Sequence, residues 1–322
     1  MNVLMVGSGS IAGLHAHAIR GLGHRLHGVV GRRESQVSQF AAEFGFASYG
    51  IDLETALDDG HVDVVFITTP SDLHRVHATA ALKRGLPTVV EIPVATSLAD
   101  AEAIDQAGRL AAVPVMAAHT RRFQPAMQRM RQMVADGDLS VHHAIQRYGF
   151  IRRQNVNWVG YERSWTDNLI WHHGGHAVDA WMWVLGLSDV EVSARLGAPH
   201  HHLGIPMDVV MALEVPNGLI GSVTLSYNTH IPIDDAMFIG EEDTVIADYA
   251  TGRLTGKDGA ILDVGMTEVV PSDVISAQDA EFFEAVAAGR DPDPSIKDVM
   301  PSLRVLQVVQ DTYDARAESR KP

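Results

Sequence analysis

The chain of 322 residues contains no cysteine, no apolar stretch long enough to cross a bilayer and fewer positive than negative side chains. Without cysteine, neither disulfides nor thiolate metal sites can form, and nothing requires an oxidising compartment. We also find no signal peptide, so we expect a cytoplasmic protein that binds no membrane. The formal net charge of −15 argues against nucleic acid as a partner, because phosphate binding needs clustered positive charge. Any anion-binding site must therefore be local.

The apolar and charged fractions, 46% and 20%, are those of a globular protein with enough residues for two domains. Apolar runs alternate with helical patterns over residues 1–121, which predicts a doubly wound α/β domain. Residues 122–322 are expected to form a second domain, and the strand patterns at 190–227 follow one another without an intervening helix, which predicts an antiparallel sheet. We expect its strands at 142–151, 190–196, 209–215 and 219–227, and helices at 278–288 and 299–313, the C-terminal helix being able to pack back on the first domain.

A glycine-rich turn joins the first predicted strand to the first predicted helix. Gly7 allows a sharp turn, Gly9 lets backbone approach a pyrophosphate, and the small Ala12 lets the helix pack on the strand. Phosphate would then meet the N–H groups and the positive end of the helix. An ordinary glycine-rich turn is the alternative. The residues predicted to bind a dinucleotide here are Gly7, Ser8, Gly9, Ser10, Ile11 and Ala12.

The end of the second predicted strand distinguishes NADP from NAD. An NAD site usually places an acidic residue there, about 20 residues past the glycines, to bind the ribose 2′-hydroxyl. This chain has Gly31, Arg32 and Arg33 instead, and guanidinium groups bind a 2′-phosphate through charge-assisted hydrogen bonds. We therefore predict NADP as the cofactor. A pair of solvated surface arginines is the alternative.

A third apolar run, residues 62–70, is typical of a strand buried on both faces of a parallel sheet. Thr68, Thr69 and Pro70 stand at its carboxyl end, where open α/β sheets bind their ligands. We expect these three residues to line the cofactor site.

Three histidines, His172, His173 and His176, occur where a predicted helix begins near residue 171. His172, His176 and Asp179 fall at i, i+4 and i+7 and share one face of that helix. Such histidines can be core residues with internal partners, catalytic groups or ligands of a zinc ion. We predict catalytic histidines and no metal, because hydride transfer with an imidazole base needs none. Three further histidines at 200–202 are expected to lie in a solvated loop.

Several short motifs occur in an order that resembles the glucose-fructose oxidoreductase/inositol dehydrogenase family across nearly the whole chain. They are Gly7 to Gly13 with His15, Thr69-Pro70 followed by His74, Glu91-Ile92-Pro93, Arg121-Arg122-Phe123, and Gly174 to Asp179. The resemblance implies a Rossmann domain followed by an α/β domain whose large, open, mostly antiparallel sheet makes subunit contacts, hence a homo-oligomer, dimer or tetramer. It also implies that His74, Glu91 and Ile92 lie at the cofactor.

Two motifs depart from the pattern of that family. Ile92 stands where the family's Glu-Lys-Pro motif has a catalytic lysine, and His172 replaces the first aspartate of D-x-G-x-H-x-x-D. Both departures resemble one subgroup, the NADP-dependent dehydrogenases of 4-carboxy-2-hydroxymuconate-6-semialdehyde in protocatechuate 4,5-cleavage. The resemblance implies oxidation of the cyclic hemiacetal of that semialdehyde to 2-pyrone-4,6-dicarboxylate.

A cluster of arginines on an otherwise acidic chain completes the mechanistic hypothesis. Guanidinium forks match carboxylates, so arginines would hold a small carboxylated substrate while an imidazole removes the hemiacetal proton. We expect His176 to be the base, oriented by Asp179, with His172 or His173 as its competitor. For some of the arginines, a surface charge or a domain contact is the alternative. The predicted substrate-binding residues are Arg121, Arg122, Arg152, Arg163 and Trp165.

Two other functions are compatible with the sequence. An NADP-dependent sugar or inositol dehydrogenase is the first, and the absence of the family's lysine at Ile92 argues against it. A catalytically silent NADP-binding regulator is the second, and the retention of His176 and Asp179 argues against it.

Overall fold

The computed structural model describes residues 1–154, 168–265 and 272–319, which form two compact units. The first unit contains Met1–Thr120 and Ser272–Met300, and the remaining described residues belong to the second. The predicted boundary after residue 121 lies one residue from the observed division. The prediction of one continuous second domain over 122–322 is wrong for residues 272–300, because they pack into the first unit.

The first unit is built on a six-stranded sheet of order β3-β2-β1-β4-β5-β6, whose strands pair in parallel. All four residues of the β4 sequence VVFI are buried, as expected for a strand covered on both faces. The strand order reverses between β1 and β4, so the prediction of a doubly wound sheet is confirmed. The strands are β1 (Asn2–Val6), β2 (Arg25–Val30), β3 (Ser48–Gly50), β4 (Val64–Ile67), β5 (Thr88–Val90) and β6 (Val115–Ala117).

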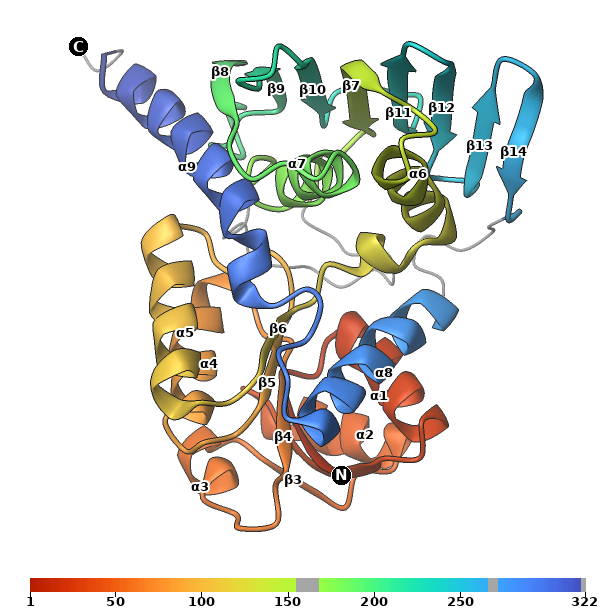
Figure 1. Ribbon diagram of the computed structural model, residues 1–322. Coiled ribbons are helices and arrows are strands. Elements are labelled where there is room, and N and C mark those ends of the chain that lie inside the picture. Colours follow the sequence, from red (N-terminus) through yellow and green to blue (C-terminus); the bar gives the residue numbers. More distant parts are fainter. Residues whose placement is uncertain (155–167, 266–271, 320–322) are drawn as a thin grey trace. The chain divides into compact units, whose positions relative to one another are not determined.

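Helices cover both faces of this sheet (Figure 1). Helix α1 contacts α2 and α8 on one face, and α4 contacts α3 and α5 on the other. Helix α8 comes from the far end of the chain and packs on the sheet through Phe282 and Phe283, whose rings both contact Phe66 of β4. The helices of this unit are α1 (Ser10–Gly21), α2 (Glu34–Phe44), α3 (Leu53–Leu57), the 3₁₀ turn η1 (Ser71–Leu73), α4 (His74–Leu82), α5 (Leu98–Ala111) and α8 (Ser272–Ala288).

The second unit is built on an eight-stranded sheet of order β14-β13-β12-β11-β7-β10-β9-β8. Its strands pair antiparallel except β7 and β10, which run parallel. The prediction of a large, mostly antiparallel sheet is therefore confirmed, although the sequence patterns indicated only four of these strands. The strands are β7 (Val141–Gly149), β8 (Glu191–Leu196), β9 (Asp208–Glu214), β10 (Ile220–Ser226), β11 (Ile233–Gly240), β12 (Thr244–Asp248), β13 (Arg253–Gly256) and β14 (Gly259–Asp263).

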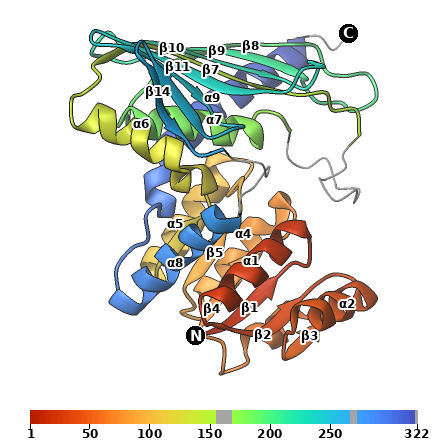
Figure 2. The ribbon, with the colours of Figure 1, turned by 90° about the vertical axis from the view of Figure 1, so that its right-hand side faces the viewer.

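Helices α6 (Pro125–Ala135) and α7 (His173–Val184) lie on one face of this sheet (Figure 2). The strands alternate accordingly, so that in β9 Val209 and Met211 are buried while Val210 between them is exposed. Trp181 of α7 packs against β10 at Gly221, where a Cβ atom would overlap the indole ring. Two further helical segments lie at the divisions between the units, the 3₁₀ turn η2 (Thr120–Phe123) and α9 (Ile296–Ser319).

Candidate active site

The predicted glycine turn lies at the carboxyl end of β1 and has the geometry that a phosphate needs. Gly7 adopts a φ of +115°, and a Cβ atom there would lie 2.6 Å from the carbonyl oxygen of Thr68, so only glycine fits. Gly9 is the N-cap of α1, and a Cβ atom on it would face open space. Around it Ser8, Ser10 and Ile11 are half-buried. A phosphate could therefore approach the N–H groups of the first turn of α1.

Helix α1 packs closely on its neighbours through two small residues, Gly13 and Ala12. Of these, only Ala12 was predicted to have this role. A Cβ atom on Gly13 would lie 2.8 Å from the ring of Phe44 in α2. Ala12 is itself fully buried. The close contact between α1 and α2 therefore also requires a small residue at Gly13, which no sequence pattern indicated.

The two arginines after β2 are exposed, as an anion-binding role requires. Gly31 packs close to the turn, since a Cβ atom there would lie 3.2 Å from Ser8 Oγ. Arg33 donates a hydrogen bond of 2.8 Å to Gln36 Oε1. In the part of the chain that the structure describes, neither Arg32 nor Arg33 pairs with a carboxylate. Both guanidinium groups are therefore open to an external anion.

His74, predicted to lie at the cofactor, joins two loops of the first unit. Its Nε2 lies 2.7 Å from the carbonyl oxygen of Thr69, and its Nδ1 lies 2.9 Å from that of Pro93. Thr68 donates its hydroxyl to Val6 of β1. His74 thus fixes the backbone of the loops after β4 and β5, and its direct contact with a cofactor stays a prediction.

Glu91 belongs to a buried network that the sequence did not reveal. His15 of α1 is fully buried, with Nε2 2.8 Å from Glu91 and Nδ1 2.8 Å from Asp279 of α8. Gln278 donates to Asp279, and Glu91 accepts a hydrogen bond from the N–H of Ile92. The carboxylate of Glu91 thus holds His15 and the loop that carries Ile92, and its predicted place at the cofactor stays a prediction.

This network predicts a pH-dependent stability. Burial by itself lowers the pKa of His15, but the charge of Asp279 and hydrogen bonds to both carboxylates outweigh it and raise that pKa to about 10. His15 therefore stabilises the folded chain fully below its unfolded pKa of about 6.5, and this contribution is lost as the pH rises through the folded pKa. Between pH 7 and 10, the free energy of unfolding should fall by up to about 1.4 kcal/mol per pH unit through this group.

Urea denaturation of the wild type and of His15→Gln across this pH range measures the slope, which should be shallower in the variant. NMR titration of the His15 ring in the intact protein is an independent check. A ring that loses its proton near pH 6.5 would contradict the prediction.

In the second unit, the segment before α7 is held by α9. The side chain of Asn168 accepts hydrogen bonds from the N–H groups of Ile170 and Trp171. Gln310 of α9 accepts from both the Asn168 amide and the Trp171 indole. The helix then starts at His173, with His172 as its N-cap, close to the predicted start near residue 171.

The three predicted histidines gather at the start of α7. The ring centroids of His172 and His173 lie 4.4 Å apart, and that of His176 lies 6.2 Å from His172 and 6.4 Å from His173. His173 is buried, whereas His172 and His176 are half-buried. Burial and the neighbouring positive groups hold the pKa of His173 well below its usual value. His173 is therefore a neutral imidazole at physiological pH.

Two tyrosines from the sheet complete this cluster. Tyr148 of β7 stacks on His173 with ring centroids 4.4 Å apart. The hydroxyl of Tyr227, just after β10, lies 2.5 Å from His173 Nδ1 and accepts a hydrogen bond of 2.9 Å from Arg152. No motif in the sequence marks these tyrosines as site residues. The available signal was their place near the ends of two predicted strands.

Two of the predicted substrate arginines already have internal partners. Arg122 donates two hydrogen bonds, of 2.9 and 2.7 Å, to Asp179, and Ser302 donates a third. Arg121 makes a bidentate pair with Asp234 of β11 and lies over the ring of Tyr148. Both guanidinium groups are therefore engaged by carboxylates of the same chain, and their predicted contact with a substrate stays a prediction. Asp179 likewise serves Arg122, and its predicted role in orienting His176 stays a prediction.

Of the other predicted substrate residues, Arg152 is buried at Tyr227, whereas Arg163 and Trp165 lie outside the described residues. The histidines at 200–202 lie in a largely exposed turn. Within the described ranges, no three His, Asp or Glu side chains are arranged to hold a metal ion. No helix among those residues is both long and apolar enough to cross a membrane.

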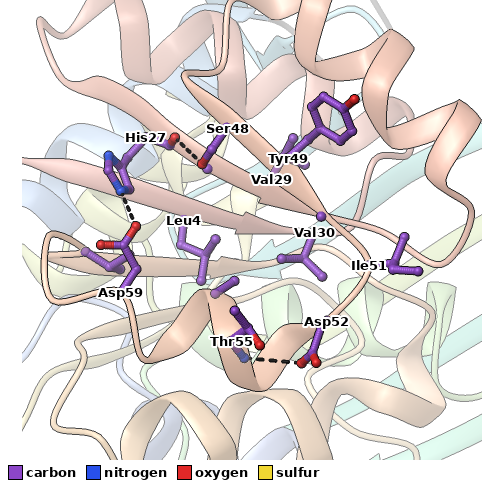
Figure 3. A pocket seen from close by; sticks show the side chains of 14 residues that line it. Leu4, His27, Val29, Val30, Ser48, Tyr49, Ile51, Asp52, Thr55 and Asp59 are labelled. Carbon is purple, nitrogen blue, oxygen red and sulfur yellow. Dashed lines mark hydrogen bonds and ion pairs between the residues drawn. The ribbon is translucent and has the colours of Figure 1, made fainter.

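A groove of about 270 Å³ lies in the first unit between α3 and strands β1 to β3 (Figure 3). Leu4 and Val29 contribute apolar lining, and His27 contributes an imidazole that lies 2.8 Å from Asp59. None of the described residues predicted for the site lines this groove. It is therefore separate from the glycine turn and from the histidine cluster.

Comparisons with known proteins follow this division of the chain. Residues 1–119 match a model of an oxidoreductase family with an NAD-binding Rossmann fold, designated GFO_IDH_MocA. Residues 125–268 match a model of the C-terminal region of bacterial oxidoreductases. The two matches together cover most of the chain.

Among individual proteins, the chain is 34% identical to the 4-carboxy-2-hydroxymuconate-6-semialdehyde dehydrogenase of Sphingobium sp. strain SYK-6, over 95% of this chain and 96% of that protein. It is 22% identical to the D-xylose 1-dehydrogenase (NADP(+)) 2 of Haloferax volcanii, over 93% of each. Its fold matches levoglucosan dehydrogenase in complex with NADH and levoglucosan, with a TM-score of 0.86, 19% identity and coverage of 97% and 96%.

Proposed function

The chain belongs to the Gfo/Idh/MocA family of oxidoreductases, and from this premise we propose that it is an NADP-dependent dehydrogenase acting on a carboxylated semialdehyde. Its reaction would convert the cyclic hemiacetal of 4-carboxy-2-hydroxymuconate-6-semialdehyde, or a close relative, to 2-pyrone-4,6-dicarboxylate. The main support is the identity of 34% along nearly the whole chain to a dehydrogenase of that name. Ile92 in place of the family's lysine and the histidine cluster at the start of α7 agree with it.

The residues of the first unit fit a phosphorylated dinucleotide. The turn at Gly7 and Gly9 would take the pyrophosphate, and Arg32 and Arg33 would take the 2′-phosphate. When bound, the nicotinamide supplies the acceptor for the hydride that leaves the substrate. The chain itself has to orient the substrate and remove its hydroxyl proton.

The histidine cluster supplies that proton acceptor. His176 is half-buried, and a neutral imidazole has a pKa near operating pH, about 6.5. We assign it as the general base. Arg152 is one of the predicted substrate arginines, and it donates a hydrogen bond to the hydroxyl of Tyr227. We propose that this guanidinium contributes to binding a substrate carboxylate, which its charge favours.

The experiment that tests this function is reduction of NADP with freshly ring-opened protocatechuate as substrate, beside a panel of sugars and inositols and with NAD in parallel. Turnover confined to the semialdehyde is the expected result. Turnover confined to polyols would establish the sugar dehydrogenase instead. Tight NADP binding without turnover on any substrate would indicate a regulator.

Replacing Arg32 and Arg33 together by alanine should weaken NADPH binding by about 10- to 100-fold, since a hydrogen bond to a charged group contributes about 1.5–3 kcal/mol. NADH binding should change little. Titration calorimetry with each cofactor measures both values, and Arg25→Ala, at the opposite end of β2 and also exposed, is the matched control. Equal losses for NADPH and NADH would remove the arginines from the 2′-phosphate site.

We also propose that the chain forms a homo-oligomer through the sheet face opposite α6 and α7. Met237 of β11 is paired with Ile145 of β7 on one side and with Ile246 of β12 on the other. In each of these strands, the residues immediately before and after are buried on the face that the helices cover. An apolar row on an uncovered face suits a subunit contact. Sedimentation velocity should show Ile246→Lys shifted toward monomer, with exposed Leu110→Lys as the control. A wild-type monomer would refute the proposal.

A further inference from the structure

Tyr227 holds His173, the buried imidazole of the cluster. Its hydroxyl lies 2.5 Å from His173 Nδ1 and 2.9 Å from Arg152 Nη1, and the tyrosine itself is fully buried. The guanidinium carbon of Arg152 also lies over the ring of Tyr227, 5.1 Å from the ring centroid. These three groups therefore form a short chain, Arg152 to Tyr227 to His173, inside the predicted substrate-binding unit.

The direction of the two hydrogen bonds follows from the chemistry of the groups. A guanidinium has donors only, so the phenol oxygen must accept from Arg152. A phenol, with a pKa of about 10, is a far better proton donor than the N–H of a neutral imidazole. The unprotonated nitrogen of that imidazole is in turn a better acceptor than the phenol oxygen. The donation from Arg152 strengthens this preference, because hydrogen bonds in a chain polarise one another. The phenol proton therefore points at Nδ1 of His173.

We propose that Tyr227 is a positioning residue that fixes His173 as the Nε2–H tautomer, which makes His173 a hydrogen-bond donor and excludes it as the general base. A neutral imidazole carries one proton, so a ring that accepts at Nδ1 must carry its hydrogen on Nε2. Burial supports the neutral form, since the pKa of His173 is held well below its usual value. The stacked ring of Tyr148 restricts the rotation of the imidazole.

This inference deepens the proposed function and, in its catalytic part, rests on it. In this arrangement His176 or His172 accepts the hemiacetal proton, and His173 donates a hydrogen bond from Nε2 to a substrate oxygen. Such a donor stabilises negative charge that develops on oxygen as the hydroxyl proton leaves. Tyr227 acts through His173 and not on the reacting atoms.

The tautomer is directly measurable and needs no substrate. Long-range ¹H–¹⁵N correlation spectra of the intact, histidine-labelled protein distinguish a protonated ring nitrogen from an unprotonated one, and His173→Gln assigns the signals. We expect a single Nε2–H tautomer in the wild type and a mixture in Tyr227→Phe. Tyr148→Phe is the matched control, because it keeps the stacked ring and removes a hydroxyl that the structure does not join to His173. In this variant the tautomer of His173 should be that of the wild type.

An Nδ1–H tautomer or a doubly protonated His173 in the wild type at neutral pH would overturn the proposal. So would an unchanged single tautomer in a folded Tyr227→Phe. Kinetics then test the catalytic part on whichever substrate the wild type turns over. Tyr227→Phe should lower kcat about 10-fold, as the loss of one aligned hydrogen bond implies, and leave NADPH affinity and the acidic limb of the kcat/KM profile unchanged. Loss of that limb in Tyr227→Phe would count against the proposal. A wild type without turnover would refute the proposed function but not the tautomer assignment.

Discussion

Replacing His176 by glutamine is expected to lower kcat about 10³-fold, within the range that general acid–base groups contribute, while NADPH binding stays unchanged. The imidazole that accepts the hemiacetal proton is lost, and glutamine keeps a similar size without a titratable nitrogen. The acidic limb of the kcat/KM profile should disappear with it. Steady-state kinetics on the semialdehyde and calorimetric titration with NADPH measure the two effects.

Two variants control this experiment. His201→Gln removes an imidazole from the exposed turn at 200–202 and should leave kcat within about twofold, since surface substitutions away from special features have small effects. His172→Gln tests the competitor on the same helix. If His172→Gln abolishes turnover and His176→Gln keeps it near the wild-type value, the base is His172.

Replacing Asp179 by asparagine is expected to lower the free energy of unfolding by about 3–5 kcal/mol, because it breaks a buried ion pair and leaves one charge uncompensated. The side chains of Arg122 and Asp179 are only 7% and 3% exposed, and the two hydrogen bonds between them are bidentate. Urea denaturation followed by tryptophan fluorescence suits the measurement, because Trp181 and Trp183 lie in the same helix as Asp179.

The double variant Arg122→Met with Asp179→Leu should recover most of that loss, since replacing a buried pair by apolar side chains is often neutral. Glu281→Gln breaks the more exposed pair with Arg290 and should change the free energy of unfolding by less than about 1 kcal/mol. A stable Asp179→Asn with greatly reduced kcat would instead support the predicted role of Asp179 in orienting His176.

The sequence determined most of the first unit because its signals are local. Apolar strands, the turn at Gly7 and the caps of the helices each depend on neighbouring residues, as when Ser97 caps α5 by accepting a hydrogen bond from the N–H of Asp100. Helix α8 is the exception, because its sequence placed it in the second domain whereas it belongs to the first unit. Its place on α1 depends on the pair of His15 and Asp279, which are 264 residues apart, and no local pattern indicates such a partner.

In the second unit, the sequence found the histidines but not the partners of the charged groups around them. Arginines near a domain junction look alike in sequence whether they bind a substrate or a carboxylate of the same chain. Arg121 is paired with Asp234, 113 residues away, through strand β11, which the patterns did not indicate. No sequence pattern therefore indicated this partner of Arg121.

The sequence by itself thus determined the Rossmann type of nucleotide-binding turn, the doubly wound sheet and the helix that carries His172, His173 and His176, because glycine turns and helical spacing are properties of adjacent residues. Only the tertiary structure decided which groups are chemically available. Arg121 and Arg122 are paired with carboxylates far away in the sequence, and His173 has a partner in Tyr227, 54 residues away. The physical reason is that burial makes every charge and hydrogen bond depend on groups brought together by folding, which spacing along the chain does not encode.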